Sequence, residues 1–165
     1  MTMTNSLRKF ALTAHVTCSV GWLGAVAGFL ALALAGATGR DVQMMRAAYL
    51  AMDLIYRSVI VPLGLASLLT GLVSSLGTEW GLFRHYWVLV KLLLTIPLTI
   101  LLLVHAQPVS TMAGAALQRT FSIADLGGLR IQLAAYAAAA LLVLLVATTL
   151  SVYRPRGLTG YGARR

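Results

Sequence analysis

The sequence predicts an all-α integral membrane protein, a four-helix transmembrane bundle with both termini in the cytoplasm. Hydrophobic residues make up 59% of its 165 residues and charged residues only 10%, whereas a soluble domain carries about 25% charged residues. Four apolar segments are each long enough for a helix that crosses the bilayer, which takes roughly 20 residues. One domain accounts for the length, with a transmembrane domain at 1–153 and a basic, flexible tail at 154–165.

The first predicted helix, at about residues 10–36, organises the rest of the chain. Phe10–Thr38 contains no Asp, Glu, Lys or Arg, yet it carries His15 about one turn from its start. At about 100° per residue, one face of this helix collects four side chains: His15, Cys18, Ser19 and Trp22. A titratable ring in a membrane segment usually faces the interior of a bundle or a polar cavity. We therefore expect this face to look inward.

Small residues mark a second strip of the first helix, where Gly24 and Gly28 are four apart. Such a strip lets another helix backbone, or a flat ligand, come close. The second predicted helix, at about residues 47–76, holds Asp53 and Arg57 at a spacing that makes them neighbours on one face.

Pro62 predicts a local bend in the second helix. The third predicted helix, at about residues 87–106, has Lys91 one turn in and His105 near its far end. Residues 107–130 form the longest stretch predicted not to span the membrane, and part of it suits an interfacial helix. The fourth predicted helix covers about residues 131–153.

The connection at 77–87 is dense in aromatic residues, which collect at the bilayer interface. The aromatic residues of this connection are Trp80, Phe83, Tyr86 and Trp87.

The net charge of +9 lies at segment ends and in the tail. This distribution is typical of topology determinants and of attraction to anionic lipid head groups, and it argues against nucleic acid as a partner. With four spans, one side holds eight basic residues: Arg8, Lys9, Arg84, Lys91, Arg154, Arg156, Arg164 and Arg165. The other side holds five: Arg40, Arg46, Arg57, Arg119 and Arg130. The excess places both termini in the cytoplasm.

This topology sorts the polar residues into two layers. The first and third helices begin on the same side, so His15 and Lys91 are predicted to lie at similar depth near the cytoplasmic boundary. A second layer gathers toward the opposite boundary: Asp53, Arg57, His105 and Arg130.

A neutral imidazole or a deprotonated amine can supply a lone pair to an axial position of a heme iron. His15 and Lys91 are therefore candidate ligands, and His85 is a third on the same side, although its position in a loop favours a solvated surface. The alternatives for the pair are a hydrogen-bonded packing histidine and a lysine that reaches the head groups.

The spacing of His15, Trp22 and Gly24, followed by YWVLVKLLL with Trp87 and Lys91, resembles a superfamily of small helical inner-membrane proteins. That superfamily includes the membrane protoporphyrinogen oxidases of bacteria, the copper-resistance D-type proteins and several uncharacterised families. The resemblance implies that His15 and Lys91 are associated with bound heme b, accompanied by Trp22 and Trp87.

The leading hypothesis is a multi-pass protein of the inner or plasma membrane that binds heme b between helices one and three. His15 is then an axial ligand, Lys91 is either the second ligand or the partner of a propionate, and the role is redox or heme handling, including that of a heme-dependent membrane oxidoreductase. One alternative is a cofactor-free interaction or assembly subunit, whose partner is another membrane protein or a second copy of the chain. A further alternative is permeation of copper or a small molecule, which the lack of a paired methionine ladder disfavours.

Overall fold

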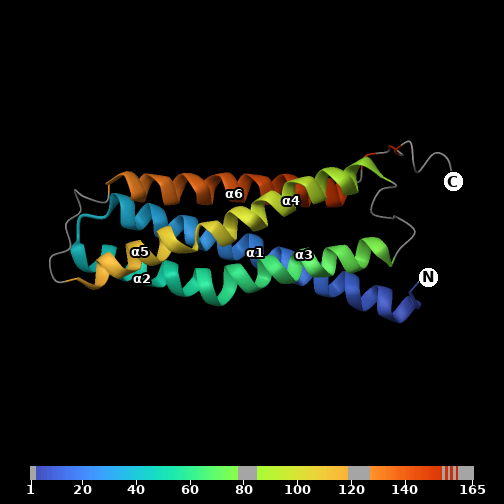
Figure 1. The fold of residues 1–165 in the computed structure, drawn as a ribbon, viewed down its shortest axis with the longest axis horizontal. Coiled ribbons are helices and arrows are strands. Elements are labelled where there is room, and N and C mark those ends of the chain that lie inside the picture. The colour runs from blue at the N-terminus through green and yellow to red at the C-terminus, as the bar shows by residue number, and fades with distance from the viewer. Residues whose placement is uncertain are drawn as a thin grey trace.

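The computed structural model describes residues 3–77, 85–118 and 127–153, together with Pro155, Gly157 and Thr159. Over these residues every regular element is a helix. In chain order they are α1 (Asn5–Thr38), α2 (Val42–Ile55), the π-helical turn η1 (Tyr56–Ile60), α3 (Val61–Leu76), α4 (Tyr86–Val104), α5 (Ala106–Leu117) and α6 (Gly127–Tyr153). The helices lie side by side along one long axis (Figure 1).

Within the described residues, four helices are long and apolar enough to cross a membrane, as predicted. They are Asn5–Thr38, Val42–Leu76, Tyr86–Leu117 and Gly127–Tyr153. The chain is therefore a multi-pass membrane protein by the length and composition of its helices. The 34 residues of α1 extend for about 51 Å at 1.5 Å per residue, whereas the hydrocarbon core is about 30 Å thick. The bundle thus reaches beyond the hydrocarbon. α1 begins and α6 ends at the same end of the bundle (Figure 1).

Helix boundaries differ most from the prediction in the third span. We expected that helix to end at about residue 106, but a further helix, α5, continues to Leu117 after a break at His105. Pro108 explains the break, because it has no N–H to donate to Val104 and its ring crowds that carbonyl. His105 accordingly has φ −82° and ψ 6°, outside the helical region. The stretch predicted not to span the membrane, residues 107–130, is thus helical over nearly its first half, to Leu117.

The predicted bend at Pro62 takes the form of the π-helical turn η1. The N–H of Val61 bonds to the carbonyl of Tyr56, five residues back. Pro62 lacks the N–H that would bond to Ser58, so the preceding turn widens to accommodate its ring. The second span therefore stays continuous from Val42 to Leu76.

α1 lies at the centre of the packing, since it contacts α2, η1, α3 and α6. α4 packs against α3 and α6, which places α1 and α4 across the bundle from each other. The largest fully buried side chains are Trp22, Tyr49, Met45, Met52 and Met112. The inner surface between α1 and α4 is therefore where side chains of the first and third spans can meet.

Three predictions fall on residues outside the described part of the chain. They concern Trp80 and Phe83 in the aromatic connection, and most of the tail at 154–165.

Candidate functional site

His15 is held in one orientation by the backbone of α3. Its Nδ1 lies 3.0 Å from the carbonyl oxygen of Ser67 and 3.2 Å from Oγ1 of Thr70. A carbonyl can only accept, so Nδ1 carries the proton and donates it. Thr70 in turn donates to the carbonyl of Ala66 at 2.6 Å. In the neutral ring, Nε2 therefore keeps its lone pair.

Lys91 faces that lone pair from the other side of the bundle. Its Nζ lies 3.1 Å from Nε2 of His15, and the amine donates the hydrogen bond. Both side chains are only partly exposed. The prediction that the two residues lie at the same depth is borne out by this contact. Their role as ligands stays a prediction.

Small residues allow the ring of His15 to approach α3. An ideal Cβ on Gly71 would lie 2.9 Å from Cε1 of His15 and 3.3 Å from its Nδ1. A turn further along α1, Ser19 Oγ lies 2.8 Å from Oγ of Ser67, which is 3% exposed. The face of α1 that carries His15 thus packs inward, as predicted, and it meets hydroxyl groups and a glycine.

The two tryptophans named with the pair lie elsewhere. Trp22 is deeper in the bundle, 1% exposed, and the edge of its indole lies against Gly64, where an added Cβ would come within 3.2 Å. Trp87 is half-buried, and its ring lies 6.4 Å from that of His85 between centroids. The groups that bond to the His15 ring are the carbonyl of Ser67, the hydroxyl of Thr70 and the amine of Lys91.

The opposite polar layer does not form one site. Arg130 of α6 donates from Nε to the hydroxyl of Tyr49 at 3.0 Å and from Nη2 to the carbonyl of Gly36 at 2.9 Å. It also donates to the carbonyl of Ala37. These hydrogen bonds connect the end of α1 to α2 and α6, so Arg130 has a structural role: it holds the ends of three helices together.

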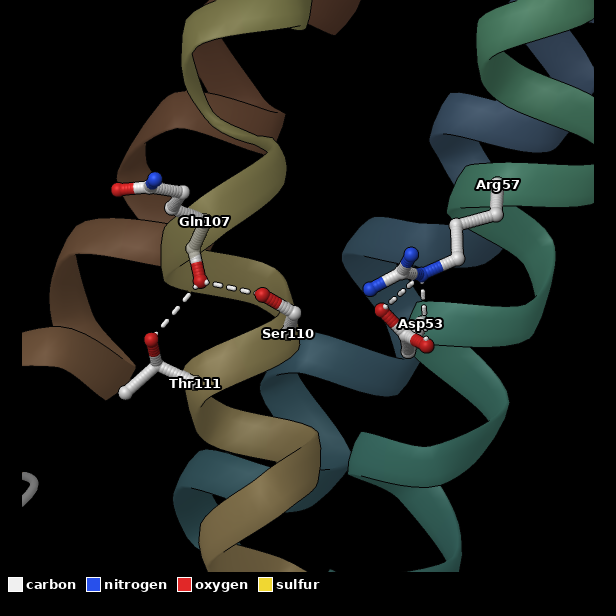
Figure 2. Close-up of polar contacts among 5 residues, drawn as sticks. All are labelled: Asp53, Arg57, Gln107, Ser110 and Thr111. Carbon is white, nitrogen blue, oxygen red and sulfur yellow. Dashed lines mark hydrogen bonds and ion pairs between the residues drawn. The ribbon is translucent and has the colours of Figure 1, made fainter.

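Asp53 and Arg57 pair as predicted, with Nε of Arg57 2.9 Å and 3.0 Å from the two carboxylate oxygens. Figure 2 shows this pair on the second span, with Gln107 of α5 accepting from Ser110 and Thr111 through its own backbone carbonyl. The pair and these hydroxyls are therefore each satisfied locally.

The glycines of the predicted strip on α1 face outward. Gly24 and Gly28 are exposed, and an ideal Cβ on either would meet nothing within 4 Å. Within the described bundle, no neighbouring helix packs closely against these two glycines. Gly71 and Gly64 of α3 do so instead, toward His15 and Trp22.

Sequence reasoning found both members of the pair but missed the residues that orient it. The sequence does predict a face of small residues on the second helix, formed by Gly64, Ser67, Gly71 and Ser74, but not that Ser67 and Gly71 of this face contact His15. Thr70 lies beside that face and carried no signal of its own. Over the described residues, no three His, Cys, Asp or Glu side chains gather into a potential metal site.

The fold and the site define a class: a four-span helical membrane protein with an oriented histidine–lysine pair in its interior. Comparison with family models, curated proteins and solved structures finds no match.

Proposed function

We propose that the His15–Lys91 pair is the attachment point of a heme b group in a protein with a redox or heme-handling role. The observation that carries the proposal is the hydrogen bond from Nδ1 of His15 to the carbonyl of Ser67. Ligating histidines almost always donate their other ring N–H to such a partner, which fixes both tautomer and orientation. Nε2 is thereby the atom with a free electron pair.

The donor set fits a heme iron in its chemistry. The porphyrin supplies the equatorial ligands, so the protein needs to provide only one or two axial atoms. An imidazole Nε2 and a primary amine are both nitrogen donors. Bound heme would supply one-electron exchange.

The observed contact is the hydrogen-bonded arrangement of the pair. Two nitrogens on opposite sides of one metal would lie about 4 Å apart, because metal–nitrogen bonds are about 2 Å long. The observed separation of Nζ and Nε2 is 3.1 Å. Lys91 must therefore withdraw before heme is held by His15, and its four-carbon stem is flexible enough for that movement. It then serves as second ligand or as the cation that pairs with a propionate.

We place this site on the cytoplasmic side of an inner or plasma membrane. α1 begins and α6 ends at one end of the bundle (Figure 1), and the predicted topology assigns eight of the thirteen basic residues of the sequence to that side. Alkaline phosphatase fused after Arg165 should be inactive, and a fusion at Arg119 should be active. The reverse pattern would move the pair to the outer side.

Visible spectra of His15 variants test the heme proposal. The purified protein should show a Soret band and sharp α and β bands after reduction with dithionite. His15→Ala should remain folded and lose these bands, whereas His105→Ala, a matched histidine change at the far end of α4, should keep them. Lys91→Ala should shift or weaken the bands. Wild-type protein that shows no Soret band, even after titration with hemin, would contradict the proposal.

A second candidate function is a cofactor-free assembly subunit, which two observations favour. The contact between Lys91 and His15 satisfies both side chains without a ligand. The exposed Gly24 and Gly28 offer an outer strip to another helix. In that case Gly24→Leu should abolish self-association or capture of a partner in crosslinking. Under the heme proposal it should leave the spectrum unchanged.

A further inference from the structure

An apolar cavity of about 70 Å³ lies deeper in the bundle than His15 and Lys91, and neither of those residues lines it. All four spans contribute to its walls. Representative lining residues are Trp22, Phe29, Tyr56, His105, Tyr136 and Ala137. The volume is several times the roughly 10–15 Å³ that one water requires. A single ring can therefore enter it.

One wall of this cavity carries a buried donor that lacks an acceptor. Trp22 is 1% exposed, and its Nε1 forms no hydrogen bond within the described residues. An indole N–H can only donate, and a buried donor without a partner costs free energy. A ligand that brings an acceptor oxygen would remove that cost.

A second polar group, the imidazole of His105, lines the cavity. His105 donates from Nδ1 to the carbonyl of Leu101 at 2.8 Å, so in its neutral form Nε2 can accept. Its ring packs edge-on against Tyr136, with centroids 4.1 Å apart. Leu101 is 39% exposed and Tyr136 37% exposed on the outer surface of the bundle. Two residues of the cavity lining thus also contribute to the outer surface of the bundle.

Two helix irregularities border the cavity. Tyr56 and Ile60 of its lining belong to the π-helical turn η1, and His105 is the break between α4 and α5. π-helical turns inside α-helices occur frequently at functional sites. Here they make room among helices that otherwise pack closely.

We infer that this cavity binds the head ring of a lipid-soluble para-quinone that enters from the bilayer. The ring is flat and apolar on its faces, which suits walls formed by Phe29, Tyr56 and Tyr136. Its oxygen accepts from Nε1 of Trp22. In the reduced form, a hydroxyl can also donate to Nε2 of His105. The inference stands independently of heme binding, because the two sites share no residue.

Fluorescence of Trp22 tests the placement directly. In a Trp80→Phe, Trp87→Phe background, Trp22 is the remaining tryptophan. A decyl-substituted dimethoxy-methyl-benzoquinone should then quench its emission saturably in detergent. Decylbenzene, which has the same tail and no oxygen, should not compete. Absence of saturable quenching, or equal competition by decylbenzene, would overturn the inference.

Variants separate the ring site from general lipid binding, with affinity read from the rise of the unfolding temperature with ligand concentration. Trp22→Phe keeps an aromatic wall and should weaken quinone binding about three- to tenfold, the worth of one hydrogen bond. Ala137→Leu should fill the cavity and abolish binding. Ala147→Leu is the matched control, since Ala137 and Ala147 are both 5% exposed on α6 but only Ala137 lines the cavity.

If Ala137→Leu fails to fold, Ala140→Leu replaces it, because Ala140 also lines the cavity and is less buried. Wild-type affinity in both Trp22→Phe and the leucine variant would overturn the inference. His15→Ala should bind the quinone normally while losing heme. Loss of quinone binding in His15→Ala would show that the quinone occupies the His15–Lys91 region instead.

Discussion

Replacing Gly71 by alanine should disturb the oriented histidine more than any other single methyl group. The added Cβ would lie 2.9 Å from Cε1 of His15, nearer than two carbon atoms ordinarily approach. The ring cannot move aside without stretching its hydrogen bonds to the carbonyl of Ser67 and to Lys91. The effect on the site and the effect on stability therefore share one cause.

The size of the effect follows from three contributions. Alanine gains about 0.8–1.0 kcal/mol over glycine in a helix. Crowding a packed interior costs about 1–3 kcal/mol, and a weakened hydrogen bond costs about 0.5–1.5 kcal/mol. The free energy of unfolding of Gly71→Ala should thus fall by roughly 0.5–3.5 kcal/mol. Gly24→Ala, which meets no atom within 4 Å, should leave it unchanged or raise it by up to about 1 kcal/mol.

The assay is unfolding of both variants in mixed micelles of increasing SDS content, followed by far-ultraviolet circular dichroism. Hemin titration of the same samples measures the site. Under the heme proposal, Gly71→Ala should also bind hemin more weakly than Gly24→Ala does. Equal stability and equal hemin binding in the two variants would refute the reasoning, because the methyl group would then have displaced nothing.

Two further predictions concern the ends of the helices. Arg130→Gln should lower the free energy of unfolding by about 2–4 kcal/mol, because a charged donor is lost and the carbonyls at the end of α1 lose a cation. The control is Arg8→Gln at an exposed site, which should change the free energy of unfolding by less than about 0.5 kcal/mol in the same SDS assay. Asp41 caps α2 by accepting from the N–H groups of Gln43 and Met44 at 3.1 Å and 3.2 Å, so Asp41→Ala should cost about 0.5–2 kcal/mol while Asp41→Asn should cost little. Arg130→Gln as stable as Arg8→Gln, or Asp41→Ala as stable as Asp41→Asn, would contradict these assignments.

Sequence reasoning predicted the architecture because membrane segments are specified by length and composition. It also predicted that His15 and Lys91 lie at similar depth, because with four spans the first and third helices begin on the same side of the membrane. The continuation of the third span as α5 was missed because Pro108 reads as a terminator from sequence. In the structure it only interrupts the hydrogen-bond ladder at His105, and the helix resumes one residue later.

The orientation of His15 could not be predicted, because it depends on which glycine lies opposite the ring. Gly24 and Gly71 are equally small, and both belong to strips with helical spacing. Only the rotation of α1 against α3 decides that Gly71 faces the ring of His15 while Gly24 faces outward. Spacing along one helix contains no information about the rotation of its neighbour.

The two polar layers differ in how completely their members are satisfied, and this separates a structural role from a functional one. Arg130 bonds a hydroxyl and two helix-terminal carbonyls, so moving it would leave several groups unpaired. Lys91 donates to Nε2 of His15 from the end of a flexible side chain. If the Lys91 amine moves away, the Nε2 lone pair becomes available, while the bond from Nδ1 to the carbonyl of Ser67 still holds the imidazole ring in place. Replacing that amine by another electron-pair acceptor therefore costs little reorganisation. Under the heme proposal the His15–Lys91 pair would exchange partners, whereas the hydrogen bonds of Arg130 would stay in place.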